Sequence, residues 1–271
     1  EVSLFIAARL DLPLPGAAVL PPVCPHCDCV IDPNGHHLFN CPSGATQRHS
    51  QIQFQLLTIG RKGCGLNGCV EQRGLYHDDK RPDVSFSGFI SRKMRGKTLI
   101  IDTTVTKSFV TTKLNASGDT LARADRTNRA AAKEPGYFGE HARDGKEAKY
   151  RTNTGDSPAG TVFKAFEMES GGRFGRGALE VLDFLCAEFV AKKKGTKAFF
   201  YALYGPQMAL AFWRGTAAKL ARWYIDDGTR RSTNPRAAMY ASEVDAISDQ
   251  MGAEVFRFHK DLYAQGTSPA G

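Results

Sequence analysis

Two aspartates in a strand-like region are the residues best suited to catalysis. Asp83 follows Arg81 and Pro82, and Asp102 lies inside the run TLIIDTTV at 98–105. The stretches 84–89 and 98–105 are rich in strand-forming residues, and the basic connector SRKMRGK between them suits a hairpin of adjacent antiparallel strands. Pairing of the strands would bring the two carboxylates side by side, where a hard dication such as Mg²⁺ or Mn²⁺ relieves their repulsion. We therefore expect Asp83 and Asp102 to hold a catalytic metal ion.

Each aspartate also has a structural reading when it is taken singly. Asp83 could simply begin a strand after proline, and Asp102 could be a hydrogen-bonded carboxylate in a core. Burying an unpaired carboxylate costs several kcal/mol unless a cation or metal compensates for it. The two aspartates together therefore favour a functional site.

A metal ion held by such a pair could activate water for attack on a phosphodiester. That reaction also requires a cation that stabilises the attacking hydroxide or the negatively charged phosphorane. Side chains alternate along a strand, so Thr104 shares a face with Asp102 but carries no charge. Lys146, with Tyr150 one helical turn later in GKEAKY, is predicted to reach in from a helix. Lys149 is predicted to point elsewhere.

Four soft ligands near the N-terminus have the spacing of a zinc knuckle. In CPHCDCVIDPNGHHLFNC, the two-residue gap between the first two cysteines lets both thiolates reach one ion from a tight turn, and DPNG then reverses the chain. His36 or His37 supplies the nitrogen, with His37 preferred, and Cys29 is an alternative to the second cysteine. The predicted ligands of a structural Zn²⁺ are Cys24, Cys27, His37 and Cys41.

The remaining pattern predicts an α/β protein in which helices surround these strands. Apolar spacing indicates helices at 4–10, 47–59, 121–133, 139–150, 178–190, 206–224 and 237–250. The glycine-rich run GRKGCGLNGC at 60–69 is predicted to end the second of them. His49 shares the apolar face of that helix, and is as well explained by a place in the core as by a functional role.

Composition favours a globular protein with a polyanionic partner. Hydrophobic residues make up 42% and charged residues 24% of the 271 residues, and the formal charge of +8 suits nucleic acid. No apolar stretch reaches the roughly 18 residues that cross a bilayer, and no secretory signal is recognisable. We expect an intracellular protein without a membrane partner.

The order of these motifs resembles the restriction-like endonuclease domain, of the PD-(D/E)XK type, found in site-specific, early-branching non-LTR retrotransposon proteins. The resemblance extends over about residues 1–225, although the insertion between Asp102 and Lys146 is long. The matching elements, in order, are the C-x2-C…H…C knuckle, Arg48-His49, Glu71, RPD at 81–83, IIDTTV around Asp102, and K-x-x-x-Y at 146–150.

This resemblance implies a restriction-endonuclease-like mixed sheet flanked by helices, and a Mg²⁺-dependent nick in double-stranded DNA that primes reverse transcription. It places catalysis on Asp83, Asp102 and Lys146, with Tyr150 beside them. Glu71 is a possible further carboxylate, and Arg48, His49 and Arg81 are candidate DNA contacts.

The resemblance also sets expectations for the organisation and setting of the chain. We expect a linker and zinc knuckle at 1–45, the nuclease domain at 46–225 and a helical tail at 226–271. Element RNA, a linked reverse transcriptase and a nuclear location are implied, with this chain either a fragment or a stand-alone descendant. The competing readings are a junction-resolving or repair nuclease, and a zinc-stabilised DNA-binding module whose nuclease centre has decayed.

Overall fold

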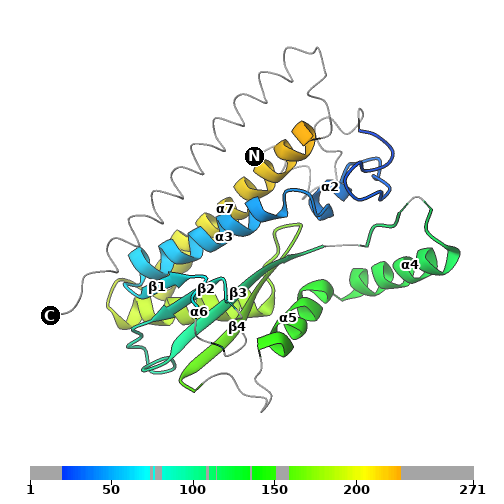
Figure 1. Cartoon of the computed structure of the whole chain (residues 1–271). Coiled ribbons are helices and arrows are strands. Elements are labelled where there is room, and N and C mark those ends of the chain that lie inside the picture. The colour runs from blue at the N-terminus through cyan, green and yellow to red at the C-terminus, as the bar shows by residue number, and fades with distance from the viewer. Residues whose placement is uncertain are drawn as a thin grey trace, which may run out of the picture.

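A computed structural model describes residues 20–73, 76, 81–107, 110–113, 115–134, 136–150 and 159–226. Its centre is a four-stranded sheet with helices on both faces, as Figure 1 shows. The helices expected at 4–10 and 237–250, and nearly all of the expected tail at 226–271, lie outside the described residues. Among the described helices, none is both long and apolar enough to cross a bilayer.

The sheet is mixed, and its strands follow one another in chain order. β1 (Asn67–Val70), β2 (Val84–Ser87) and β3 (Thr98–Thr106) pair antiparallel, and β4 (Thr161–Glu169) runs parallel to β3. β2 and β3 form the expected hairpin, with Val84 opposite Ile101 and Phe86 opposite Leu99. The predicted α/β architecture with a mixed sheet is therefore confirmed.

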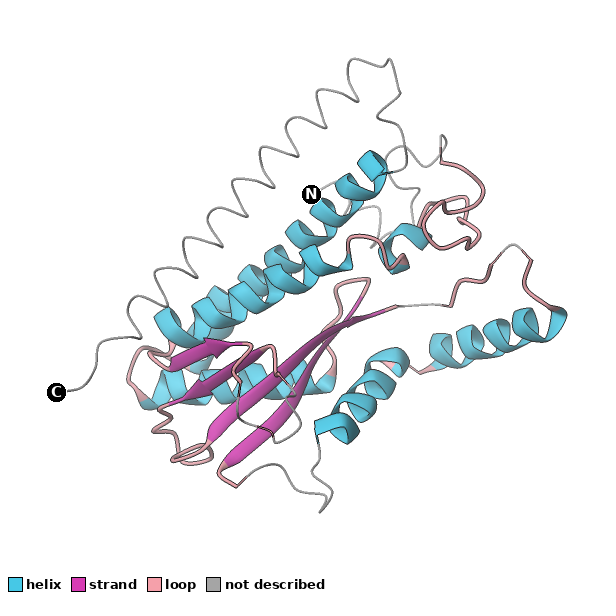
Figure 2. Cartoon of the chain, in the orientation of Figure 1, coloured by secondary structure: helices cyan, strands magenta, loops and turns pink. Residues whose placement is uncertain are grey.

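Helices cover the two faces unequally. α3 (Ala45–Thr58), α6 (Arg176–Ala191) and α7 (Lys197–Asp226) lie on one face, and α5 (Tyr137–Tyr150) lies on the other (Figures 1 and 2). The alternation of β3 explains this division. Leu99 and Ile101 belong to the large core that contains α3, α6 and α7, whereas Ile100 packs with Tyr150 of α5.

Two further helices lie at the margins of this core. The short α2 (His37–Asn40) belongs to the knuckle, and α4 (Gly118–Lys133) extends from α5 within the polar insertion that follows β3. Ser117 caps α4 by accepting a hydrogen bond from the N–H of Thr120. The helices expected at 121–133, 139–150 and 178–190 are thus confirmed, each beginning two or three residues earlier than predicted.

The glycine-rich run does not simply end a helix, as predicted. α3 continues into a π-helical turn, η2 (Ile59–Gly63), and the run then supplies β1. A Cβ on Gly60 would lie 2.1 Å from the ring of Phe86, so this glycine allows the turn to approach β2 closely. Glycine is needed here for close packing, whereas the sequence-based prediction treated the glycines only as residues that end a helix.

Two other elements differ from the sequence-based expectation. β4 was not predicted, because both of its faces are largely covered, by Phe166 on one side and Ala165 on the other, so the strand lacks a simple polar–apolar alternation. α7 begins at Lys197, and Pro206 lies inside it, although Pro206 was expected to begin the helix. Burial of Phe200 and Phe212 on either side of Pro206 outweighs the hydrogen bond that proline cannot donate.

Candidate functional site

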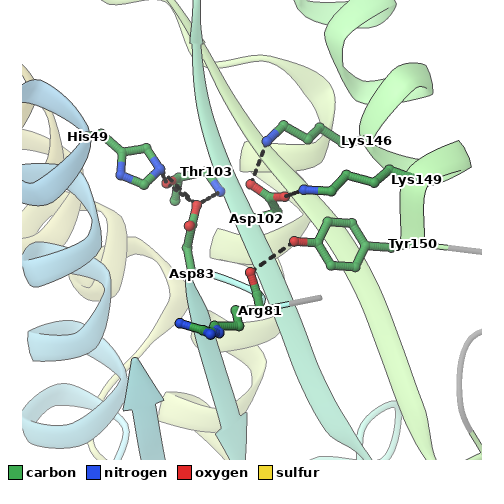
Figure 3. Close-up of polar contacts among 8 residues, drawn as sticks. All are labelled: His49, Arg81, Asp83, Asp102, Thr103, Lys146, Lys149 and Tyr150. Carbon is green, nitrogen blue, oxygen red and sulfur yellow. Dashed lines mark hydrogen bonds and ion pairs between the residues drawn. The ribbon is translucent and has the colours of Figure 1, made fainter. Parts of the chain in front are cut away.

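The β2–β3 register brings the two aspartates together. Asp83 stands one position before the Val84–Ile101 pair, which places it across from Asp102 on the neighbouring strand. Figure 3 shows the two carboxylates on adjacent strands, one turned toward α3 and the other toward α5. The hairpin thus sets the two residues across from each other on adjacent strands, as predicted, with their carboxylates turned toward different helices.

Asp83 is held by groups on the α3 side of the sheet. Its Oδ2 accepts hydrogen bonds from the backbone N–H of Thr103 at 2.6 Å and from the Thr103 hydroxyl at 2.6 Å. The same oxygen lies 2.8 Å from Nε2 of His49. Burial alone would raise the pKa of Asp83, but the hydrogen bonds and charge of His49, with Thr103, hold it below its ordinary value. Asp83 is thus kept ionised.

Asp102 is deeper and is held by lysines from α5. Its side chain is 4% exposed, and Lys146 Nζ lies 2.7 Å from its Oδ1. Its Oδ2 is buried and has no hydrogen-bond partner among the described residues. Burial raises the pKa of the Asp102 carboxyl, and the nearby charge of Asp83 acts in the same direction against Lys146. The expected reach of Lys146 into the site is confirmed.

Lys149 was predicted to point elsewhere, and this was wrong. Its Nζ lies 3.9 Å from Asp102 Oδ2, so the two α5 lysines approach different oxygens of one carboxylate. Lys146 and Lys149 are three residues apart and therefore share a face of the helix. Their exposure differs, because the Lys149 side chain is 52% exposed and the Lys146 side chain 29%.

Tyr150 fixes α5 to the sheet. Its ring stacks on Phe163 of β4, with centroids 4.4 Å apart, and its hydroxyl donates to the backbone carbonyl of Arg81 at 3.1 Å. Burial and the charge of Asp102 raise the pKa of Tyr150, so the phenol stays protonated. The structure therefore makes Tyr150 a residue that positions Lys146 and the RPD segment.

Three other predicted site residues lie outside this pair. Arg81 is exposed, and Glu71 is exposed with its backbone N–H donating to the carbonyl of Asp83 at 3.1 Å. No group of three potential ligands that includes Glu71 and the aspartates occurs in the described part of the chain. Arg48 was expected to contact DNA, but its side chain is buried and donates to the Phe39 carbonyl, so this expectation is corrected.

Sequence reasoning did not single out Thr103. Its hydroxyl lies 2.6 Å from His49 Nε2 and also donates to Asp83, so Thr103 links α3 to the aspartate. The available signal was the alternation of TLIIDTTV, which turns Thr103 away from Asp102 and toward the face that the helix of His49 covers. The sequence explained His49 equally well as a core residue and as a functional one, and its contacts with Asp83 and Thr103 place it at the site.

Near the N-terminus, four predicted ligands form a second cluster. The cluster consists of Cys24, Cys27, His37 and Cys41, whose ligand atoms all lie within 4.8 Å of one another. Cys24 Sγ and Cys41 Sγ are 3.6 Å apart, close to the roughly 3.8 Å that separates two sulfurs on a tetrahedral zinc ion. Cys27 Sγ lies 3.3 Å from His37 Nε2. This cluster could hold a metal ion such as zinc.

The choice of His37 over His36 follows from the loop that precedes α2. Oδ1 of Asp32 accepts a hydrogen bond from the N–H of His36 at 3.0 Å, and Oδ2 accepts one from the N–H of His37 at 2.6 Å. These bonds begin α2 and point the second imidazole inward, where burial lowers the pKa of His37 and favours the neutral, ligating form. Cys29 is not a member of the cluster.

A buried carboxyl on β4 has no place in either cluster. Glu167 Oε1 accepts a hydrogen bond from the N–H of Gly177 at 2.7 Å, and Oε2 is buried without a hydrogen-bond partner among the described residues. A Cβ on Gly177 would lie 2.6 Å from that oxygen, so the glycine makes room for it. Burial raises the pKa of Glu167 to about 7.

We predict that Glu167→Gln stabilises the fold at high pH. The pKa of Glu167 is higher in the folded chain than in the unfolded chain. The contribution of this carboxyl to the free energy of unfolding is therefore most favourable at pH values below its unfolded pKa, and it is lost as pH rises through about 7. Glutamine should raise the free energy of unfolding by about 3 kcal/mol near pH 8 and by only about 1 kcal/mol near pH 5.5. Denaturant unfolding with excess zinc measures both, with the exposed Glu134→Gln as control. An equal effect at both pH values would contradict the prediction.

No family model matches this chain, and no curated protein shows significant similarity to it. The function must therefore be inferred from the geometry of the two clusters.

Proposed function

We propose that this chain is a metal-dependent DNA endonuclease of the PD-(D/E)XK type, related to the restriction-like endonuclease domain of non-LTR retrotransposon proteins. The observation that supports it most is the pairing of Asp83 with Asp102 across β2 and β3, with Lys146 on the second carboxylate. A paired carboxylate site with an adjoining lysine is suited to phosphodiester hydrolysis.

Asp83 and Asp102 would hold a Mg²⁺ or Mn²⁺ ion. The buried Oδ2 of Asp102, which lacks a hydrogen-bond partner among the described residues, and the ionised Asp83 opposite it fit a hard cation that prefers oxygen ligands. Such an ion, when bound, lowers the pKa of a water ligand and offsets charge on the phosphoryl group. His49 and Thr103 keep the Asp83 carboxylate oriented and charged.

Lys146 provides the positive charge that Thr104 lacks. Its ammonium lies 2.7 Å from Asp102 Oδ1 and is partly exposed, so it would stabilise an attacking hydroxide or the negative phosphorane. Tyr150 holds the helix that carries Lys146 against the sheet through Phe163 and the RPD backbone.

The reaction product tests this proposal and separates it from a junction-resolving or repair nuclease. A labelled duplex incubated with the protein and Mg²⁺ should be nicked in one strand, and the nick should carry a 3′-hydroxyl that a DNA polymerase extends. A four-way junction should be cut no faster than the duplex. Preferential cutting of the junction would favour a junction-resolving nuclease. The third alternative, a DNA-binding module whose nuclease centre has decayed, is disfavoured because both aspartates are present.

We propose in addition that the N-terminal cluster binds one structural Zn²⁺. All four ligands come from the protein, which leaves no open position for substrate. Because zinc binding to such a loop contributes directly to its folding, removal should unfold the knuckle. The proposed setting is a nuclear retroelement protein, in which double-stranded target DNA is cut beside element RNA and a linked reverse transcriptase.

Metal analysis checks the zinc proposal. Purified protein should contain about one zinc per chain, and Cys41→Ser should reduce this by at least about tenfold and lower the melting temperature. Cys69→Ser is a matched control, because Cys69 is an exposed cysteine outside the cluster. Wild-type zinc content in Cys41→Ser protein would remove the proposal.

A further inference from the structure

Two buried cations meet at one carbonyl beside the knuckle. Lys219 of α7, which is 0% exposed, donates from Nζ to the Phe39 carbonyl at 2.9 Å. Arg48 of α3, which is 4% exposed, donates from Nη1 to the same oxygen at 3.1 Å. Phe39 lies between the candidate ligands His37 and Cys41, so helices from the nuclease core place both charges against the metal cluster.

This pair of cations requires a compensating negative charge. Burial and the charge of Arg48 together lower the pKa of Lys219 to about 7, and the nearby Cys41, Cys24 and Cys27 act in the opposite direction. One neutral carbonyl cannot offset two buried positive charges, and an uncompensated buried charge is strongly destabilising.

A zinc-loaded cluster supplies that charge. Three thiolates and a neutral imidazole around one dication carry a net formal charge of minus one. Because zinc binds cysteine as the thiolate and releases its proton, this negative charge forms together with the metal site. The two cations therefore gain a counter-charge when zinc binds.

We propose that Lys219 and Arg48 are the counter-ions of the zinc–thiolate cluster, so that zinc binding and docking of the knuckle onto α3 and α7 are one coupled event. This inference rests on the zinc site proposed above. It makes Lys219 a positioning residue for the metal-bound knuckle. It also predicts opposite effects of one substitution in the two metal states.

Zinc affinity, measured by competition with a chromophoric chelator, tests the coupling. The Lys219→Met protein, in which the side chain keeps most of its length but loses its charge, should bind zinc at least about tenfold more weakly than the wild type. Lys219→Gln keeps a hydrogen-bond donor without the charge, and its zinc affinity should fall by a similar factor. Lys197→Met removes an exposed lysine from the same helix, and its zinc affinity should stay within about twofold.

Thermal unfolding separates the charge from packing. With excess zinc, Lys219→Met should melt below the wild type, and with zinc chelated it should melt at the same temperature or higher. Equal losses in both states, or zinc affinity within about twofold of wild type for either substitution, would overturn the proposal. Bound Co²⁺ should give the same thiolate spectrum in wild type and variants. A wild-type protein without that spectrum would refute the zinc site itself, which is a distinct failure.

Discussion

Replacing Asp83 or Asp102 with alanine should abolish DNA cleavage while DNA binding is retained. Each substitution removes one of two proposed metal ligands, and the loss of the ion should lower the cleavage rate by at least about 10³-fold. Binding should stay equal or become slightly stronger, because a negative charge is lost where phosphate approaches. Single-turnover cleavage and a gel-shift titration measure the two properties.

Asp144→Ala provides a matched control. Asp144 lies on α5, the helix that carries Lys146, but its side chain is 67% exposed and contacts Arg143 away from the pair. Its cleavage rate should remain within about twofold of the wild type. Cleavage by Asp102→Ala at the rate of Asp144→Ala would place the catalytic centre elsewhere.

Lys146→Ala should lower the cleavage rate by about 10²-fold or more, with Mg²⁺ affinity retained. Its Nζ lies 2.7 Å from Asp102 Oδ1, whereas Lys149 Nζ is 3.9 Å from Oδ2 and more exposed. Lys149→Ala should therefore lower the rate by less than about tenfold, because water screens its charge. Rates at saturating Mg²⁺ measure both effects.

The two lysines are matched controls for each other. A larger loss in Lys149→Ala than in Lys146→Ala would exchange their roles and leave the aspartate pair as the metal site. Lys146→Arg keeps the charge but changes its geometry, so partial activity is expected. Full activity in Lys146→Ala would remove lysine from the chemistry.

The positions of Asp83 and Asp102 relative to each other could be predicted largely from the local sequence. The β-branched stretch around Asp102 and the length of the connector determine a hairpin, and the hairpin register then sets Asp83 across from Asp102. The cysteine spacing was equally informative, because a two-residue gap and a turn bring four ligands together with few degrees of freedom.

Features that depend on tertiary packing were not predictable in this way. The orientation of α5 decides whether Lys149 reaches Asp102, and that orientation follows from the stacking of Tyr150 on Phe163 of β4, a strand that the sequence pattern concealed. Arg48 resembled a surface cation in the sequence. Only the packing of α7 beside α3 shows it to be buried.

The most direct test of the proposed nuclease centre is nicking of supercoiled plasmid by the wild-type protein as Mg²⁺ is varied. Mg²⁺ should be removed by desalting, because a strong chelator would also strip zinc from the knuckle. Nicking should be absent without Mg²⁺ or Mn²⁺, and its rate should rise to saturation as either ion is added. Folded, zinc-containing protein that binds DNA but leaves the plasmid intact at every Mg²⁺ and Mn²⁺ concentration would contradict it.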